Sequence, residues 1–173
     1  MKKLNKYKSL ALSLVITMIA LQGCIDEAPD IGEPFDRLSN LAGTWELQKL
    51  TLNDEDAVRK GFPAFVQSVD ITNLYPFTDV SLTLNLDEEG NPSTFEVNTG
   101  GAPNYFGAES GSWSVDDLGA PAEINFAGGN TIELTTYLGL TEGALTVKFV
   151  RYETRSNGDR VSFLSYEYEF VKQ

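Results

Sequence analysis

Alternation of apolar and polar residues is the feature that most restricts how this chain can fold. From Ser81 to Leu86, leucine takes every second position between serine, threonine and asparagine. The same period of two recurs in the runs 94–98, 113–115, 124–126, 132–134 and 145–149. Because successive side chains of a strand point to opposite faces, the pattern predicts antiparallel sheet with one buried and one solvated face.

Short turn sequences separate these runs, as at 87–91, 128–130 and 156–159. Connections of hairpin length make strands that are consecutive in sequence neighbours in space, which predicts an up-and-down meander. The chain beyond residue 38, roughly 135 residues, suffices for one compact domain and not for two.

Two long runs change phase partway. The first changes between Leu47 and Leu50, and the last between Phe163 and Leu164. A shift of one residue turns later side chains to the opposite face unless an extra residue is absorbed, so we expect β-bulges near Gln48 and near Phe163. Long strands bent at bulges are what barrel closure requires. The predicted fold is all-β: a single antiparallel up-and-down β-barrel of about eight strands.

One short helix is expected in the first long loop. Asn53 can cap it, the acids 54–56 fill its first turn, and Gly61 ends it. The following segment, 61–79, is rich in aromatic residues and lacks steady alternation, so we expect it to form a lid over the barrel mouth. A second long loop is expected at 99–111.

The amino-terminal segment has the composition of a secretory signal. Its first eight residues contain four lysines and no acid, and Leu10 to Leu21 is an apolar run too short to span a bilayer comfortably. The sequence Leu21, Gln22, Gly23, Cys24 resembles the bacterial lipoprotein box. The resemblance implies cleavage before Cys24 and acylation of this residue, which would anchor the chain in a membrane. The alternative is an ordinary cleaved signal followed by a free cysteine.

The chain therefore divides into a signal peptide at 1–23, an acidic flexible tether at 24–38 and the barrel domain at 39–173. The acids that follow Cys24 are similar to the export tag of surface-displayed lipoproteins in Gram-negative bacteria, which implies an outer-membrane location at the cell surface. The alternative is a solvated linker with no export role, which would leave the protein facing the periplasm.

Charge and composition exclude several classes of function. The chain has 13 basic and 25 acidic residues, a net charge of −12, and loss of residues 1–23 leaves 9 basic and 25 acidic residues, or −16. Such a chain repels phosphates, so no nucleic-acid partner is expected. The absence of histidine excludes histidine-based catalytic triads and most zinc sites. No cofactor is expected.

The opening of the first strand, from Gly43 to Trp45, resembles the G-x-W start of lipocalins. It is most similar to the lipocalin-like domains of unknown function found in bacterial surface lipoproteins. The resemblance implies that Trp45 closes the floor of the barrel and that a basic side chain from a late strand packs across its indole. Arg151 is the candidate for this role, because it continues the inward parity of the strand that includes Phe149.

Acidic residues in the turns offer little catalytic chemistry. A glycosidase needs two carboxyl groups facing each other across a cleft, whereas the acids at 54–56, 87–89 and 116–117 fall in turns and at a helix start. The turn at 87–91 is rich enough in oxygen to bind calcium, but its spacing matches no EF-hand. We therefore expect neither an enzyme nor a metal site.

Two hypotheses remain for function. In the first, the protein is a non-catalytic binding module that holds a small amphiphile or glycan fragment at the barrel mouth. In the second, it is an accessory protein with a solid barrel that docks on an outer-membrane complex. An internal cavity would favour the first, and a filled interior the second. The candidate ligand-binding residues are Phe62, Phe65, Tyr75, Phe77 and Tyr105.

Overall fold

A computed structural model describes residues 35–173, which form one compact unit. The predicted signal peptide, Cys24 and most of the predicted tether lie outside the described residues. The elements are α2 (Arg37–Leu41), β1 (Gly43–Asp54), α3 (Glu55–Arg59), α4 (Ala64–Gln67), β2 (Ser68–Asp70), η1 (Phe77–Asp79), β3 (Ser81–Leu86), β4 (Pro92–Asn98), β5 (Ser110–Val115), β6 (Glu123–Phe126), β7 (Thr131–Thr136), η2 (Leu140–Glu142), β8 (Ala144–Thr154) and β9 (Arg160–Lys172).

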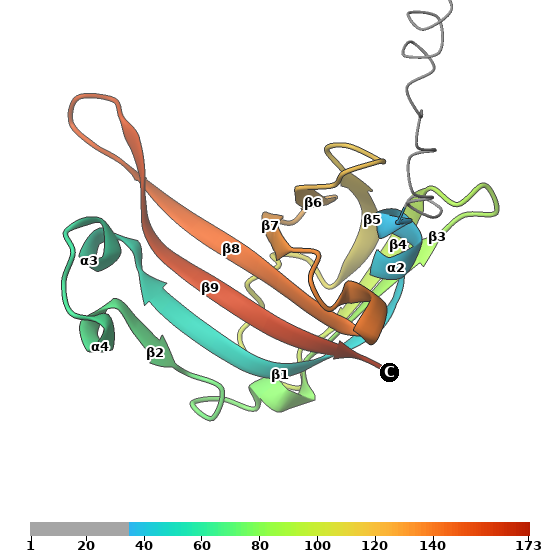
Figure 1. The fold of residues 1–173 in the computed structure, drawn as a ribbon, viewed down its shortest axis with the longest axis horizontal. Helices are drawn as coiled ribbons and strands as arrows, with labels where there is room; N and C mark the ends of the chain where they lie inside the picture. Colours follow the sequence, from blue (N-terminus) through green and yellow to red (C-terminus); the bar gives the residue numbers. More distant parts are fainter. Residues whose placement is uncertain (1–34) are drawn as a thin grey trace, which may run out of the picture. The chain divides into compact units, whose positions relative to one another are not determined.

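Antiparallel pairing joins the nine strands of the described region into one sheet in the order β2-β1-β3-β4-β5-β6-β7-β8-β9. The sheet closes because β1 also pairs with β9, from Trp45 opposite Lys172 to Asp54 opposite Leu164. Eight strands thus form an up-and-down barrel, and β2 adds a short ninth strand beside the end of β1 (Figure 1). The predicted fold class is confirmed.

Both predicted bulges are present. In the β1–β9 pairing, Leu47 lies opposite Phe170 and Lys49 opposite Glu169, so Gln48 is the extra residue. In the β8–β9 pairing, Arg151 lies opposite Leu164 and Tyr152 opposite Ser162, so Phe163 is the extra residue. Each bulge bends a long strand where the sheet curves around the barrel.

The floor of the barrel is built around Trp45, which is fully buried. Its indole N–H donates to the carbonyl of Leu41 at 2.8 Å, so helix α2 covers this end. The ammonium of Lys172 lies 5.1 Å from the centre of the Trp45 ring. Gly43 makes room for it: a Cβ at Gly43 would lie 2.6 Å from Lys172 Cε, and its φ of +126° favours glycine.

The prediction that Arg151 packs across Trp45 is wrong. Its parity was assigned correctly, since Arg151 pairs with Leu164 on the inward side of β9, but parity does not fix position along the barrel. Arg151 lies at the end remote from Trp45, where its guanidinium is 5.4 Å from the ring centre of Phe163. The cation that packs over Trp45 comes from the last strand instead.

The short helices are more numerous than expected. The first connection contains α3 and α4, and α3 is capped by Asp54, whose carboxylate accepts from the backbone N–H groups of Asp56 and Ala57. Helix α2 begins inside the segment expected as a tether, because Asp36 caps it and Leu38 is buried. An acid that reads as part of a solvated linker is here a helix cap.

Replacing Trp45 by alanine should lower the free energy of unfolding by about 3–5 kcal/mol, because the indole is fully buried and its removal leaves a cavity. Urea denaturation followed by circular dichroism measures the change. Leu138→Ala is the matched control, since Leu138 is 86% exposed and should change stability by less than about 0.5 kcal/mol. Equal effects of the two substitutions would contradict the buried floor.

Candidate functional site

A row of aromatic rings crosses the end of the barrel opposite Trp45. Tyr75 meets Phe77 edge to face with ring centroids 5.7 Å apart, and Phe77 stacks on Tyr105 at 6.4 Å. Tyr105 stacks on Tyr166 at 4.1 Å, and Tyr166 on Phe149 at 6.2 Å. Three predicted ligand-binding residues are therefore brought together, but they pack against one another and close the mouth.

Several elements supply this row. The first connection contributes Tyr75 and Phe77, and the loop between β4 and β5 contributes Tyr105, whose carbonyl accepts from the side-chain amide of Asn130 at 2.8 Å. Sequence reasoning did not assign Tyr166 or Phe149 to the site. The alternation of the last two strands indicates that both side chains point inward. It does not indicate how far along the barrel axis they lie.

Below this row the interior is filled by further rings. The ring centroid of Phe106 lies 5.1 Å from that of Tyr168 and 5.7 Å from that of Phe126. The ring centroids of Phe126 and Phe95 are 4.5 Å apart. Phe106 comes from the same loop as Tyr105 and is only 2% exposed, so this loop folds into the barrel. The contacts run from wall to wall and make the barrel a packed core.

The tyrosines of this interior are poor acids. Burial, together with the neighbouring Tyr166, raises the pKa of Tyr105 to about 12. Burial raises the pKa of Tyr168 well above its ordinary value. Both phenols therefore stay protonated at neutral pH, and their rings serve packing. The Tyr168 hydroxyl is buried and finds no hydrogen-bond partner among the described residues.

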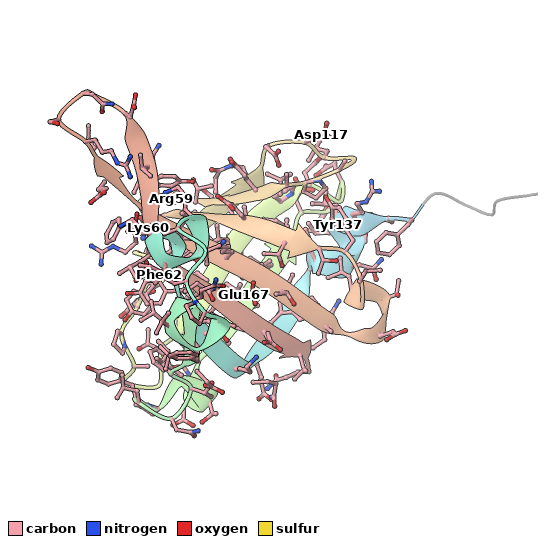
Figure 2. All side chains as sticks on the ribbon, turned by 60° about the vertical axis from the view of Figure 1, so that its left-hand side comes forward. Arg59, Lys60, Phe62, Asp117, Tyr137 and Glu167 are labelled. Atoms are coloured by element: carbon pink, nitrogen blue, oxygen red, sulfur yellow. The ribbon has the colours of Figure 1, made fainter. Side chains whose placement is uncertain are left out.

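The other two predicted ligand-binding residues lie outside the aromatic row. Phe62 follows α3 and is 50% exposed, and Phe65 in α4 is 83% exposed. They belong to a group of large apolar side chains that the first connection leaves exposed: Val58, Phe62, Phe65, Val66, Val69, Leu74 and Tyr75. We call this group the first-connection surface. Figure 2 shows Phe62 beside Arg59 and Lys60, whereas Asp117 and Tyr137 lie at the other end of the barrel.

Helix α3 is fixed to the outer face of the barrel by a polar contact. The Glu55 carboxylate accepts from the Ser165 hydroxyl at 2.6 Å and pairs with the Lys148 ammonium at 2.6 Å. Burial opposes ionisation of Glu55, but these two partners outweigh it and lower the pKa of its carboxyl group. The contact holds the start of the first-connection surface in a defined place.

The predicted lid, 61–79, covers the mouth only in part. Its strand β2 extends the sheet beside β1, with Val69 opposite Leu52. Its middle is held where the Thr72 hydroxyl accepts from the backbone N–H of Leu50 at 2.9 Å. Only Tyr75 and Phe77 reach the aromatic row, because pairing with β1 keeps the rest at the side of the barrel.

The acidic turns use their carboxylates to fix the backbone. Asp87 accepts from the N–H groups of Glu89 and Asn91, and Asp116 from those of Ala122 and Glu123. Within residues 35–173, no group of three or more acidic or cysteine side chains is placed to hold a metal ion.

Three hollows of the described region are open grooves on the outer surface. One, of about 530 Å³, lies between β7 and the far end of β8 and is lined by Glu133, Tyr152 and Arg160. A second, of about 460 Å³, lies between α3 and the same end of β8. The third, of about 600 Å³, adjoins Phe35 and Leu138. Each opens to solvent.

Residues 24–153 match a family described as a domain of unknown function, DUF5004. The chain belongs to this family. A search of curated proteins and a search of solved structures each gave no match.

The DUF5004 match ends at Glu153, close to the end of β8, whereas the strand that closes this barrel is β9. The matched segment includes the first connection and the aromatic loop between β4 and β5. None of the helices in the described part of this DUF5004 chain is long and apolar enough to cross a membrane.

Proposed function

We propose that the protein is a non-catalytic, lipid-anchored docking module of the cell envelope. Its packed barrel would present the first-connection surface to a protein partner in the outer membrane. The observation that carries this proposal is the exposure of seven large apolar side chains between Val58 and Tyr75, on a barrel whose own interior is filled by rings.

Exposed apolar groups of this density favour a contact surface. Monomeric soluble proteins rarely leave large contiguous apolar patches in water, and burial contributes about 25 cal/mol for each Å² removed from solvent. Charged groups border the patch, since Asp56 pairs with both Arg59 and Lys60. An apolar centre with a polar rim is the usual composition of a protein–protein interface.

A protein partner fits this surface better than the lipid surface itself. The anchored chain would have a net charge of −16, which opposes close approach to anionic headgroups. The two cations nearest the patch are already paired with Asp56, so they offer little attraction to such headgroups. The partner should therefore present an apolar patch of its own.

The anchor is the lipoprotein box that ends at Cys24, preceded by the basic start and apolar run of a signal peptide. Three acyl chains at Cys24 would hold the protein durably on a membrane. The acids after Cys24 support the surface of the outer membrane as the location, and a periplasm-facing position is the alternative.

A second candidate function is supported by the unpartnered hydroxyl of Tyr168. This hydroxyl lies near Tyr105 and Tyr166, directly below the row of rings that closes the mouth. If Tyr105 moved aside, a small amphiphile could enter with a polar group against this hydroxyl and its apolar part against the rings. This candidate is the binding of a small amphiphile or glycan fragment at the mouth.

The docking surface predicts a directional contact. A photo-crosslinking amino acid at Phe65 or Leu74, introduced in the cell of origin, should join the protein to one outer-membrane protein, whereas the same group at the exposed Glu96 should not. Binding of the purified pair should weaken at least about tenfold with Phe65→Ser. Leu138→Ser, at another exposed apolar position, is the matched control and should leave the affinity unchanged. Equal crosslinking at all three sites would refute the docking surface.

Replacing Cys24 with alanine should move the protein from the membrane fraction to the soluble fraction, because the acceptor of the acyl chains is lost. Fractionation of cells followed by immunoblotting measures the change. Unchanged fractionation of the Cys24→Ala protein would contradict the lipid anchor.

Tyr168→Phe separates the two candidate functions. In a packed barrel, the substitution removes an unsatisfied hydroxyl and should raise the free energy of unfolding by about 1 kcal/mol. Native mass spectrometry of protein from its own cell should then show the same mass increment, or none, in both forms. A bound amphiphile that disappears with Tyr168→Phe would instead support binding at the mouth.

A further inference from the structure

The hairpin of β8 and β9 projects beyond the rest of the barrel as a two-stranded arm (Figure 1). The last residue of β8 with a partner on β7 is Lys148, opposite Glu133. From Phe149 to Thr154, β8 pairs only with β9 in the described structure. One edge of β8 therefore presents free backbone N–H and C=O groups, which readily pair with another strand.

The groove of about 530 Å³ follows this free edge. On the arm side, the guanidinium of Arg160 lies 4.0 Å from the ring centre of Tyr152, whose hydroxyl donates to Glu133 at 3.4 Å. On the barrel side, the lining includes Glu123 and Glu133. The groove is thus basic and aromatic on one wall and acidic on the other.

The acidic wall contains an unfavourable pair. Glu123 lies directly opposite Glu133 in neighbouring strands, and like charges in such positions destabilise a sheet. Lys148 is opposite Glu133 on the other side, but its ammonium pairs with Glu55. None of the four ion pairs within residues 35–173 includes Glu123 or Glu133.

The free edge of β8 is complementary in charge to the same edge of a second copy. Residues 150–154 read Val-Arg-Tyr-Glu-Thr. When this sequence is paired antiparallel with a second copy about Tyr152, Arg151 of each copy falls opposite Glu153 of the other. The bulge in this hairpin is at Phe163 on β9, so the register of β8 stays regular. Opposite charges in directly paired positions stabilise antiparallel strands.

We propose that two copies of this chain associate through the free edges of their β8 strands. The edges pair antiparallel about a twofold axis at Tyr152, and the tip of each arm enters the groove of the other copy. In this register Arg155 falls opposite Phe149 of the second copy, on the inward face of the sheet, whereas Glu123 and Glu133 lie on the outward face.

The geometry also keeps the two barrels apart. Antiparallel pairing of two projecting arms places the barrels at opposite ends of the paired strands. This matters because residues 35–173 contain 9 basic and 21 acidic side chains, so two barrels in close contact would repel each other. The self-pairing uses none of the residues of the first-connection surface, and it stands independently of the docking proposal.

Charge exchange on the edge tests the pairing. Full-length purified protein is studied by sedimentation velocity over a range of concentrations. Arg151→Glu or Glu153→Arg alone places like charges opposite each other twice and should raise the dimer dissociation constant about tenfold. The double exchange restores both opposite-charge pairs and should return the constant to within about twofold of the original. Glu88→Arg, which changes the net charge as Glu153→Arg does but lies in the exposed turn after β3, should have no effect.

A disulfide at the axis gives a second measurement. Paired residues of antiparallel strands have Cα atoms about 4.5–5.5 Å apart, within the range that a disulfide spans. Cys24 is the single cysteine of the sequence, so in a Cys24→Ser background the introduced cysteine carries the only thiol. Tyr152→Cys should then form a covalent dimer under mild oxidation, whereas Glu96→Cys should not.

A protein that stays monomeric and gives no Tyr152→Cys dimer overturns the proposal. A dimer that is unaffected by the single charge reversals, or that the double exchange fails to restore, overturns it too, because the contact then lies elsewhere. Circular dichroism of each variant shows that the barrel is folded, so a loss of association can be assigned to the edge. None of these outcomes depends on acylation or on the docking partner.

Discussion

Pairing between β1 and β9 is the constraint on which the rest of the molecule depends. It closes the barrel, and it brings Lys172 over Trp45 at one end and Tyr166 opposite Leu52 at the other. The bulge at Gln48 absorbs one extra residue of β1. Apolar side chains therefore point into the barrel both before and after the bend. Without this pairing, neither the floor nor the aromatic row would form.

The sequence was most informative where local patterning decides structure. Alternation predicted the strands, and changes of phase predicted the bulges at Gln48 and Phe163, because inward and outward positions depend on nearest neighbours in the chain. It was least informative about position along the barrel axis. Arg151 points inward as predicted, but it lies at the opposite end of the barrel from Trp45. The cation over Trp45 is Lys172. Depth is set by pairing between strands far apart in sequence, which a single sequence does not display.

The candidate site shows the same division. Five aromatic residues of two loops were expected to act together, but β2 pairs with β1 and separates them. Phe62 and Phe65 stay at the side of the barrel in the first-connection surface, while Phe77 and Tyr105 are drawn into the aromatic row. The aromatic composition of these loops predicted a functional role for them. Strand pairing shows that some of these aromatic residues pack in the barrel instead.

Closure by two strands so remote in sequence also affects how the protein is made. Lys49 and Glu169, which pair across the seam, are 120 residues apart. Contacts of such long range must overcome loop-closure entropy before they stabilise anything, so folding should be slow for a domain of this size. Until β9 pairs with them, β1 and β8 remain open edges in the folding chain, and this is when the protein is most exposed to aggregation and to proteolysis.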